Sequence, residues 1–212
     1  MKRSRIVYFL FLFSGITALI YEVVWARMLT LAFGHTVFSV SIVLASFMAG
    51  LGFGSYFSGH AINHIGGKKT QSDSSSLSRE SSEDLEKPSL LLIYGWIEVA
   101  LFLLCLIVSL ILFKFSVIYS WFSFFVPESI VVQNIFKSFL AFILMFVPAS
   151  LMGATLPIIS QYYITDNIRL DTRLGLLYGI NTFGAALGCL LTGFFLIANF
   201  GVLQTVLAAT VL

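Results

Sequence analysis

The chain has 212 residues, of which 58% are hydrophobic and only 10% are charged, and its formal net charge is +2. This composition, with 22 phenylalanines, is more apolar than that of a water-soluble domain and indicates a membrane protein surrounded by a lipid bilayer. The small net charge and the lack of a stripe of lysine and arginine exclude a nucleic-acid-binding surface.

Long apolar segments follow one another along the whole chain. About 20 apolar residues cross the roughly 30 Å hydrocarbon layer as an α-helix. Five segments reach that length and a sixth begins, which predicts an all-α, polytopic membrane helical bundle with five complete transmembrane helices and a partial sixth. The short sixth segment also predicts a fragment of a longer reading frame. The segments are 6–33, 37–62, 90–113, 131–163, 174–199 and 202–212.

Three basic residues lie among the first five, ahead of the first apolar segment. A cleaved signal peptide is the alternative interpretation of this order, but the apolar run is too long and lacks a convincing small-residue cleavage site. Short cytoplasmic loops are rich in lysine and arginine, and such residues recur within 63–89 and at Arg169 and Arg173. We therefore expect a multi-pass protein of the cell's inner membrane with a cytoplasmic N-terminus.

The domain organisation follows from one polar, serine-rich stretch. Residues 1–62 hold the first two transmembrane helices, and residues 90–212 hold helices three to six, the last one truncated. The segment 63–89 between them lacks the apolar content needed to fold, so we expect a disordered cytoplasmic loop. On the opposite side, the aromatic segment 113–129 is expected to lie at the membrane interface.

Small residues recur every four positions in the second and fifth helices. Such stripes let helix backbones approach closely in lipid, so packing is the favoured interpretation over ligand binding. The two helices also resemble each other in local spacing, which fits either an inverted repeat or chance. The stripes are Ser46, Gly50, Gly54 and Ser58 in the second helix, and Gly184, Gly188 and Thr192 in the fifth.

Polar residues within the apolar segments are the candidates for chemistry, because ionisable groups are costly in hydrocarbon. Depth along the helices, at 1.5 Å per residue, predicts that Glu22 pairs with Lys137 and that Glu98 meets Asn181. Arg27 is expected near the outer surface, facing Glu128. Glu22 and Glu98 are candidates either for proton coupling or for hydrogen bonding between helices.

Two prolines interrupt the fourth apolar segment. Pro148 and Pro157 each remove a backbone donor and free a carbonyl four residues earlier, that of Leu144 and that of Gly153. A kink is expected at these positions, and bending is favoured over a broken helix that forms a substrate site.

No enzyme site, metal site or cofactor site is expected in these residues. His60 and His64 share the i, i+4 spacing but have no carboxylate partner, so a solvated interfacial face explains them more simply. Cys105 and Cys189 lie inside apolar segments, where a structural disulfide is not expected.

Three separated blocks carry a family resemblance: FSGITALIYEVVWARMLTLAFGHTVFSVSIVLASFMAGLGFGSYFSGH, PASLMGATLPIIS and LLYGINTFGAALGCLLTGFFLI. In this order they resemble the membrane portion of spermidine synthase-like proteins fused to a major-facilitator-type domain. The resemblance implies a major-facilitator-like half-bundle that precedes a cytoplasmic aminopropyltransferase domain of methyltransferase-like fold. None of that domain's motifs occurs in these 212 residues, so no catalytic residue is carried over.

The resemblance implies that the chain anchors or feeds a polyamine-type transferase, with a cytoplasmic synthase-like domain as its partner in the full reading frame. A secondary transporter half-bundle is the first alternative. An oligomeric membrane scaffold, in which the chain would form a homo-oligomer, is the second.

Overall fold

The computed structural model describes residues 2–34, 36–67, 76–124, 129–163 and 170–211. Within these ranges the secondary structure is helical and holds no strand, so the expected all-α class is confirmed. The elements are α1 (Lys2–Phe33), α2 (Thr36–Gly67), α3 (Ser76–Phe113), α4 (Phe115–Ser123), α5 (Ile130–Tyr163), α6 (Leu170–Leu191), the π-helical turn η1 (Thr192–Leu196) and α7 (Ile197–Val211).

The described helices include five stretches that are long and apolar enough to cross a membrane. Their outward faces carry many large apolar side chains, which only a lipid environment solvates without cost. The chain is therefore a multi-pass membrane protein. The stretches are Val7–Phe33, Val37–Ala61, Leu92–Phe113, Ile130–Ser160 and Leu174–Ala209.

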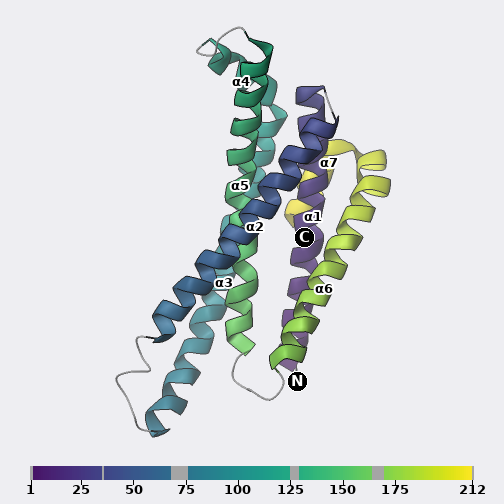
Figure 1. Cartoon of the computed structure of the whole chain (residues 1–212). Helices are drawn as coiled ribbons and strands as arrows, with labels where there is room; N and C mark the ends of the chain where they lie inside the picture. Colours follow the sequence, from purple (N-terminus) through teal and green to yellow (C-terminus); the bar gives the residue numbers. More distant parts are fainter. Residues whose placement is uncertain (1, 35, 68–75, 125–128, 164–169, 212) are drawn as a thin grey trace.

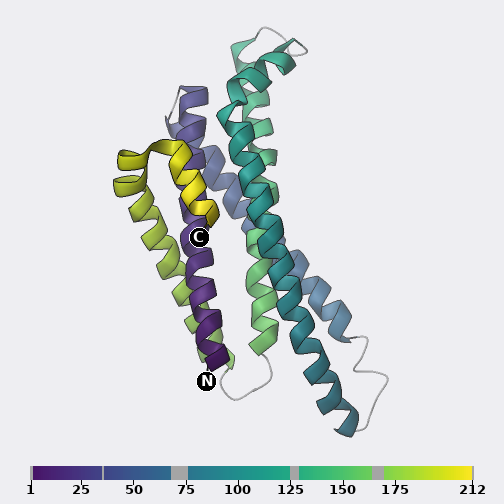
Figure 2. The same ribbon diagram turned by 180° about the vertical axis from the view of Figure 1, so that it is seen from behind.

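The long helices form two groups joined by a crossing helix. α1 and α6 lie side by side on one side of the bundle, and α3 and α5 lie side by side on the other (Figure 1). α2 starts beside the end of α1 and crosses obliquely over α5, its main packing partner (Figures 1 and 2). α1 therefore lies between α6 and the α3–α5 pair.

The last apolar stretch reverses direction at Gly201. This residue has φ 76° and ψ 175°, a conformation that glycine adopts without the steric penalty of a side chain. The chain after it turns back and runs beside α1 (Figure 2), where Val206 and Ala209 are buried. The break coincides with the predicted boundary between the segments 174–199 and 202–212.

Two separate clusters of buried side chains hold the bundle together. The larger one includes Trp25, whose ring centroid lies 5.8 Å from that of Phe47 on α2 and whose Nε1 donates a hydrogen bond to Ser109 Oγ on α3, at 2.9 Å. The smaller one joins Phe11 and Tyr94 to residues of α5 and α6. Residues 14–18 of α1 lie between the main parts of these two clusters, with Ile16 packed against the larger one.

The segment expected to be a disordered loop, 63–89, is helical over most of its length. α2 continues to Gly67 and α3 begins at Ser76, while residues 68–75 lie outside the described part of the chain. Leucine, glutamate and lysine in this segment have good helix propensity, and extending an existing helix avoids the cost of nucleation.

The aromatic segment 113–129 contains the short helix α4. Phe115 and Tyr119, four residues apart, face the bundle and are buried, whereas Val117 and Trp121 point outward and are exposed. This two-sided pattern suits a helix that lies across the end of a bundle. Its location at a membrane interface stays a prediction.

Candidate functional site between α1 and α3

The α2–α5 interface is closed by glycines. A Cβ atom at Gly54 would collide with the backbone of Ser150, and one at Gly50 would meet Ala149 and the Phe146 carbonyl. On the facing helix, a Cβ atom at Gly153 would collide with the backbone of Leu51. The two backbones therefore lie in direct contact at these positions, whereas a mainly apolar hollow of about 540 Å³ remains farther along the same two helices, lined by residues such as Phe38 and Phe139.

The second predicted stripe brings α1 and α6 into direct backbone contact in the same way. Cβ atoms at Gly184 and Gly188 would collide with the carbonyl oxygens of Leu12 and Ile16. Thr192 is fully buried and donates its hydroxyl to the Gly188 carbonyl at 2.7 Å. The structure places this stripe in helix packing.

The two serines of the first stripe are satisfied within their own helix. Ser46 Oγ donates to the Val43 carbonyl at 2.9 Å and also lies 3.8 Å from Met145 Sδ of α5. Ser58 Oγ donates to the Ser55 carbonyl at 3.3 Å. Neither serine belongs to the lining of the cavity between α1 and α3 described below.

The two prolines do not break α5, which continues from Ile130 to Tyr163 across both. Pro157 has no N–H to donate to the Gly153 carbonyl, and Ser55 Oγ of α2 donates to that carbonyl instead, at 2.8 Å. A side chain of the neighbouring helix thus satisfies the acceptor that the proline leaves free. The continuity of α5 argues against a broken-helix substrate site, and the expected kink at Pro148 and Pro157 stays a prediction.

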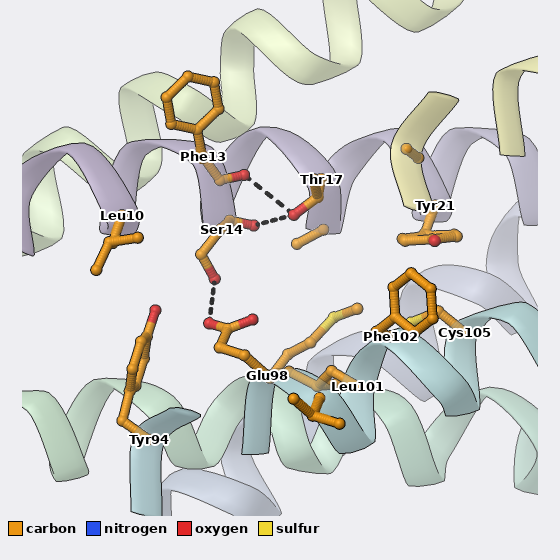
Figure 3. A pocket seen from close by; sticks show the side chains of 14 residues that line it. Leu10, Phe13, Ser14, Thr17, Tyr21, Tyr94, Glu98, Leu101, Phe102 and Cys105 are labelled. Carbon is orange, nitrogen blue, oxygen red and sulfur yellow. Dashed lines mark hydrogen bonds between the residues drawn. The ribbon is translucent and has the colours of Figure 1, made fainter. Parts of the chain in front are cut away.

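The interface between α1 and α3 borders a cavity of about 600 Å³. It differs from the mainly apolar hollows of about 440 Å³ beside α1 and α6 and about 540 Å³ beside α2 and α5 because an acidic side chain lines it. Five residues with polar side-chain atoms line it, namely Ser14, Thr17 and Tyr21 on α1 and Tyr94 and Glu98 on α3 (Figure 3). The other lining residues are mainly apolar, including Leu101, Phe102, Cys105 and, from α5 and α7, Met152 and Ala209.

One hydrogen bond crosses this cavity. Ser14 Oγ donates to Glu98 Oε1 at 3.4 Å, and Tyr94, one turn before Glu98 on α3, lines the same side of the cavity (Figure 3). Thr17 Oγ1 is directed back to its own helix and lies 3.0 Å from the carbonyl oxygens of Phe13 and Ser14. The 3.4 Å contact is long, so the Glu98 carboxyl retains most of its capacity to accept hydrogen bonds from a ligand.

Glu98 is the acidic residue of the cavity lining, and the lining contains no lysine or arginine. It lies six residues after Leu92, about 9 Å along the helix into the apolar stretch. A carboxyl group at this depth needs hydrogen bonds or a cationic partner. The arrangement is therefore suited to a ligand that donates hydrogen bonds, either a cation or a hydroxyl.

The predicted contact between Glu98 and Asn181 is wrong. Asn181 lies against Gly15, where a Cβ atom would collide with its backbone carbonyl. Because α1 lies between α3 and α6, it separates the two side chains, and Glu98 meets Ser14 of α1 instead (Figure 1).

The predicted pair of Glu22 and Lys137 is not formed either. Lys137 Nζ lies 4.4 Å from the ring centroid of Tyr119, in a cation–π contact with α4. Glu22 is only 8% exposed, and no ion pair or side-chain hydrogen bond joins it to another described residue. Depth along a helix fixes the height of a side chain but not the direction in which it points.

Arg27 is exposed. Its predicted partner, Glu128, lies outside the described residues, so this contact stays a prediction.

The remaining candidates form no site. No cluster of histidine, cysteine, aspartate and glutamate that could hold a metal ion occurs among the residues with described positions. His60 stacks on Tyr56, with ring centroids 6.3 Å apart, and His64 has no described side chain. Cys105 and Cys189 are both free thiols.

The sequence identified Glu98 but missed the residues around it. Ser14 and Thr17 are three positions apart, and Tyr94 and Glu98 are four apart, so each pair occupies one face of an apolar helix. This spacing is the signal that could have predicted a polar site between the two helices.

The fold and the site define a helical, multi-pass membrane protein with a partly polar cavity between its first and third helices. Comparisons with protein-family models, curated proteins and solved structures found no match to the chain.

Proposed function

We propose that this chain is a membrane-embedded small-molecule-binding domain, and that Glu98 recognises an amine of the ligand. The observation that carries the proposal is the 600 Å³ cavity in which, among the described residues, the Glu98 carboxyl accepts a single long hydrogen bond, from Ser14, with Tyr94 beside it. The volume lies within the range typical of small-molecule sites. An ammonium group would supply the donors that this carboxyl lacks.

The resemblance to spermidine synthase-like membrane proteins supports an amine as the ligand class. In this proposal the chain lies in the inner membrane with its N-terminus in the cytoplasm. It anchors a cytoplasmic aminopropyltransferase-like domain in the full reading frame and binds an amine next to it.

A binding measurement with two matched variants tests this proposal. The purified chain is placed in lipid nanodiscs and titrated with a panel of amines that includes spermidine, butylamine and dodecylamine. We expect Glu98→Gln to weaken the best amine by roughly 10- to 100-fold, because a hydrogen bond to a charged group is worth about 1.5–3 kcal/mol. Glu22→Gln, which alters the intramembrane carboxyl outside the cavity lining, should bind as the wild type does. Equal binding by the wild type and Glu98→Gln would overturn the proposal.

A secondary transporter half-bundle is the second candidate function. It is favoured by the close backbone contacts that glycines make in the α1–α6 and α2–α5 pairs, beside the cavity lined by Glu98 between α1 and α3, since transporters move rigid groups of helices around a central site. Proton-driven uptake of labelled amine into liposomes tests it, and uptake that is unchanged in Glu98→Gln would remove the proton role of this residue.

A further inference from the structure

The wall of the cavity opens toward lipid. Leu10 and Phe13 on α1 and Val99 and Phe102 on α3 all line it, and their side chains are 41–51% exposed. All four belong to membrane-spanning stretches, so hydrocarbon rather than water surrounds their exposed surfaces. A ligand that reaches the cavity between these side chains comes from the bilayer.

One end of the cavity lining carries the acidic side chain, and the other end is mainly apolar. Ser14, Tyr94 and Glu98 form the polar region, whereas Phe102 and Cys105 lie farther along α3, toward Tyr21 of α1 (Figure 3). A molecule that fills both regions carries one polar group at the end of an apolar body.

The charges of the lining restrict the polar group further. Glu98 is the acidic residue of the lining, so its carboxylate can neutralise one ammonium group of a ligand. Any further ammonium group of the same ligand would be buried without a partner. It offers no lysine or arginine to a phosphate, so it does not suit a zwitterionic phospholipid. A polyamine and a phospholipid headgroup both fit less well than a single amine.

We infer that the cavity takes an amphipathic monoamine from the bilayer, with its ammonium on Glu98 and its hydrocarbon chain along the apolar lining between α1 and α3. The inference rests on the proposed function and narrows it to one ligand class and one route of entry. Val99 and Phe102 on α3 flank that route.

Photo-crosslinking tests the ligand class. A dodecylamine analogue with a diazirine in its chain is added to the chain in nanodiscs, irradiated and mapped by peptide mass spectrometry. We expect crosslinks on residues 10–21 and 99–105, which Glu98→Gln reduces at least tenfold and Glu22→Gln leaves unchanged. Size-exclusion chromatography of each variant confirms that it is folded.

Competition separates this inference from the proposed function. Unlabelled dodecylamine should remove the crosslinks, whereas butylamine and spermidine at the same concentration should not. If spermidine competes equally and depends on Glu98, the proposed function stands and the monoamine inference is overturned. If crosslinks are spread evenly over the lipid-facing helices and do not depend on Glu98, both are overturned.

A mutation at the opening tests the route. Val99→Trp adds bulk at an exposed position that lines the cavity, so it should fold normally and slow crosslinking several-fold. Trp96→Val changes another lipid-facing residue of α3, outside the lining, and serves as the control. Equal crosslinking rates in the two variants would exclude entry between α1 and α3.

Discussion

The α2–α5 interface and the α1–α3 interface show two ways in which apolar helices meet in one bundle. In the first, Gly50, Gly54 and Gly153 bring the backbones into direct contact. In the second, Ser14 and Glu98 face each other across a cavity of about 600 Å³. Small side chains allow close backbone contact in lipid, whereas the α1–α3 cavity places an acidic side chain where a ligand can meet it.

The difference assigns different roles to the two regions. Lipid solvates apolar side chains as well as a helix does, so association of helices depends on close packing and interhelical hydrogen bonds. The glycine-rich interface provides both, because Ser55 also bonds to the Gly153 carbonyl. The α1–α3 interface provides less packing, and we attribute ligand recognition to it for this reason.

The largest expected effect is that of Gly54→Ala. The added methyl group would collide with the Ser150 backbone and force the two helices apart, which should lower the free energy of unfolding by about 1–3 kcal/mol. Gly52→Ala is the matched control, because a Cβ atom there meets nothing within 4 Å. Thermal unfolding in detergent measures both variants. A loss of the same size in both would show that the interface is not closed by close packing.

A smaller effect is expected for Ser55→Ala. This change leaves the Gly153 carbonyl, already without its helical donor because of Pro157, unsatisfied in the interface. The expected loss is about 1 kcal/mol, measured by the same unfolding assay. Ser58→Ala, whose hydroxyl bonds only within its own helix, should cost less. If Ser55→Ala unfolds at the wild-type temperature, the bond contributes nothing to the stability of the α2–α5 pair.

Hydropathy predicted the elements well because each span is a long apolar run that must form its hydrogen bonds internally. The second and fourth expected segments, 37–62 and 131–163, correspond to α2 and α5 within a few residues. The helical part of 63–89 was missed because its composition favours neither a membrane helix nor a buried one.

The site was predicted only in part. Glu98 stood out as an acid in an apolar helix, but its partner was assigned from depth alone, which is why Asn181 was expected in place of Ser14. The same reasoning paired Glu22 with Lys137, whose ammonium instead lies over Tyr119. Sequence gives the height of a side chain in the membrane, whereas the order of helices around the bundle decides which side chains meet.

The most direct test is to place a larger side chain in each of the two interfaces and compare the results. Ala18 lines the α1–α3 cavity, so Ala18→Leu should fill empty space and change the free energy of unfolding by no more than about 0.5 kcal/mol, while it weakens amine binding. Thermal unfolding of Ala18→Leu beside Gly54→Ala measures this difference. A loss for Ala18→Leu as large as that for Gly54→Ala would mean that α1 and α3 are as tightly packed as α2 and α5, and would contradict the existence of a ligand cavity between them.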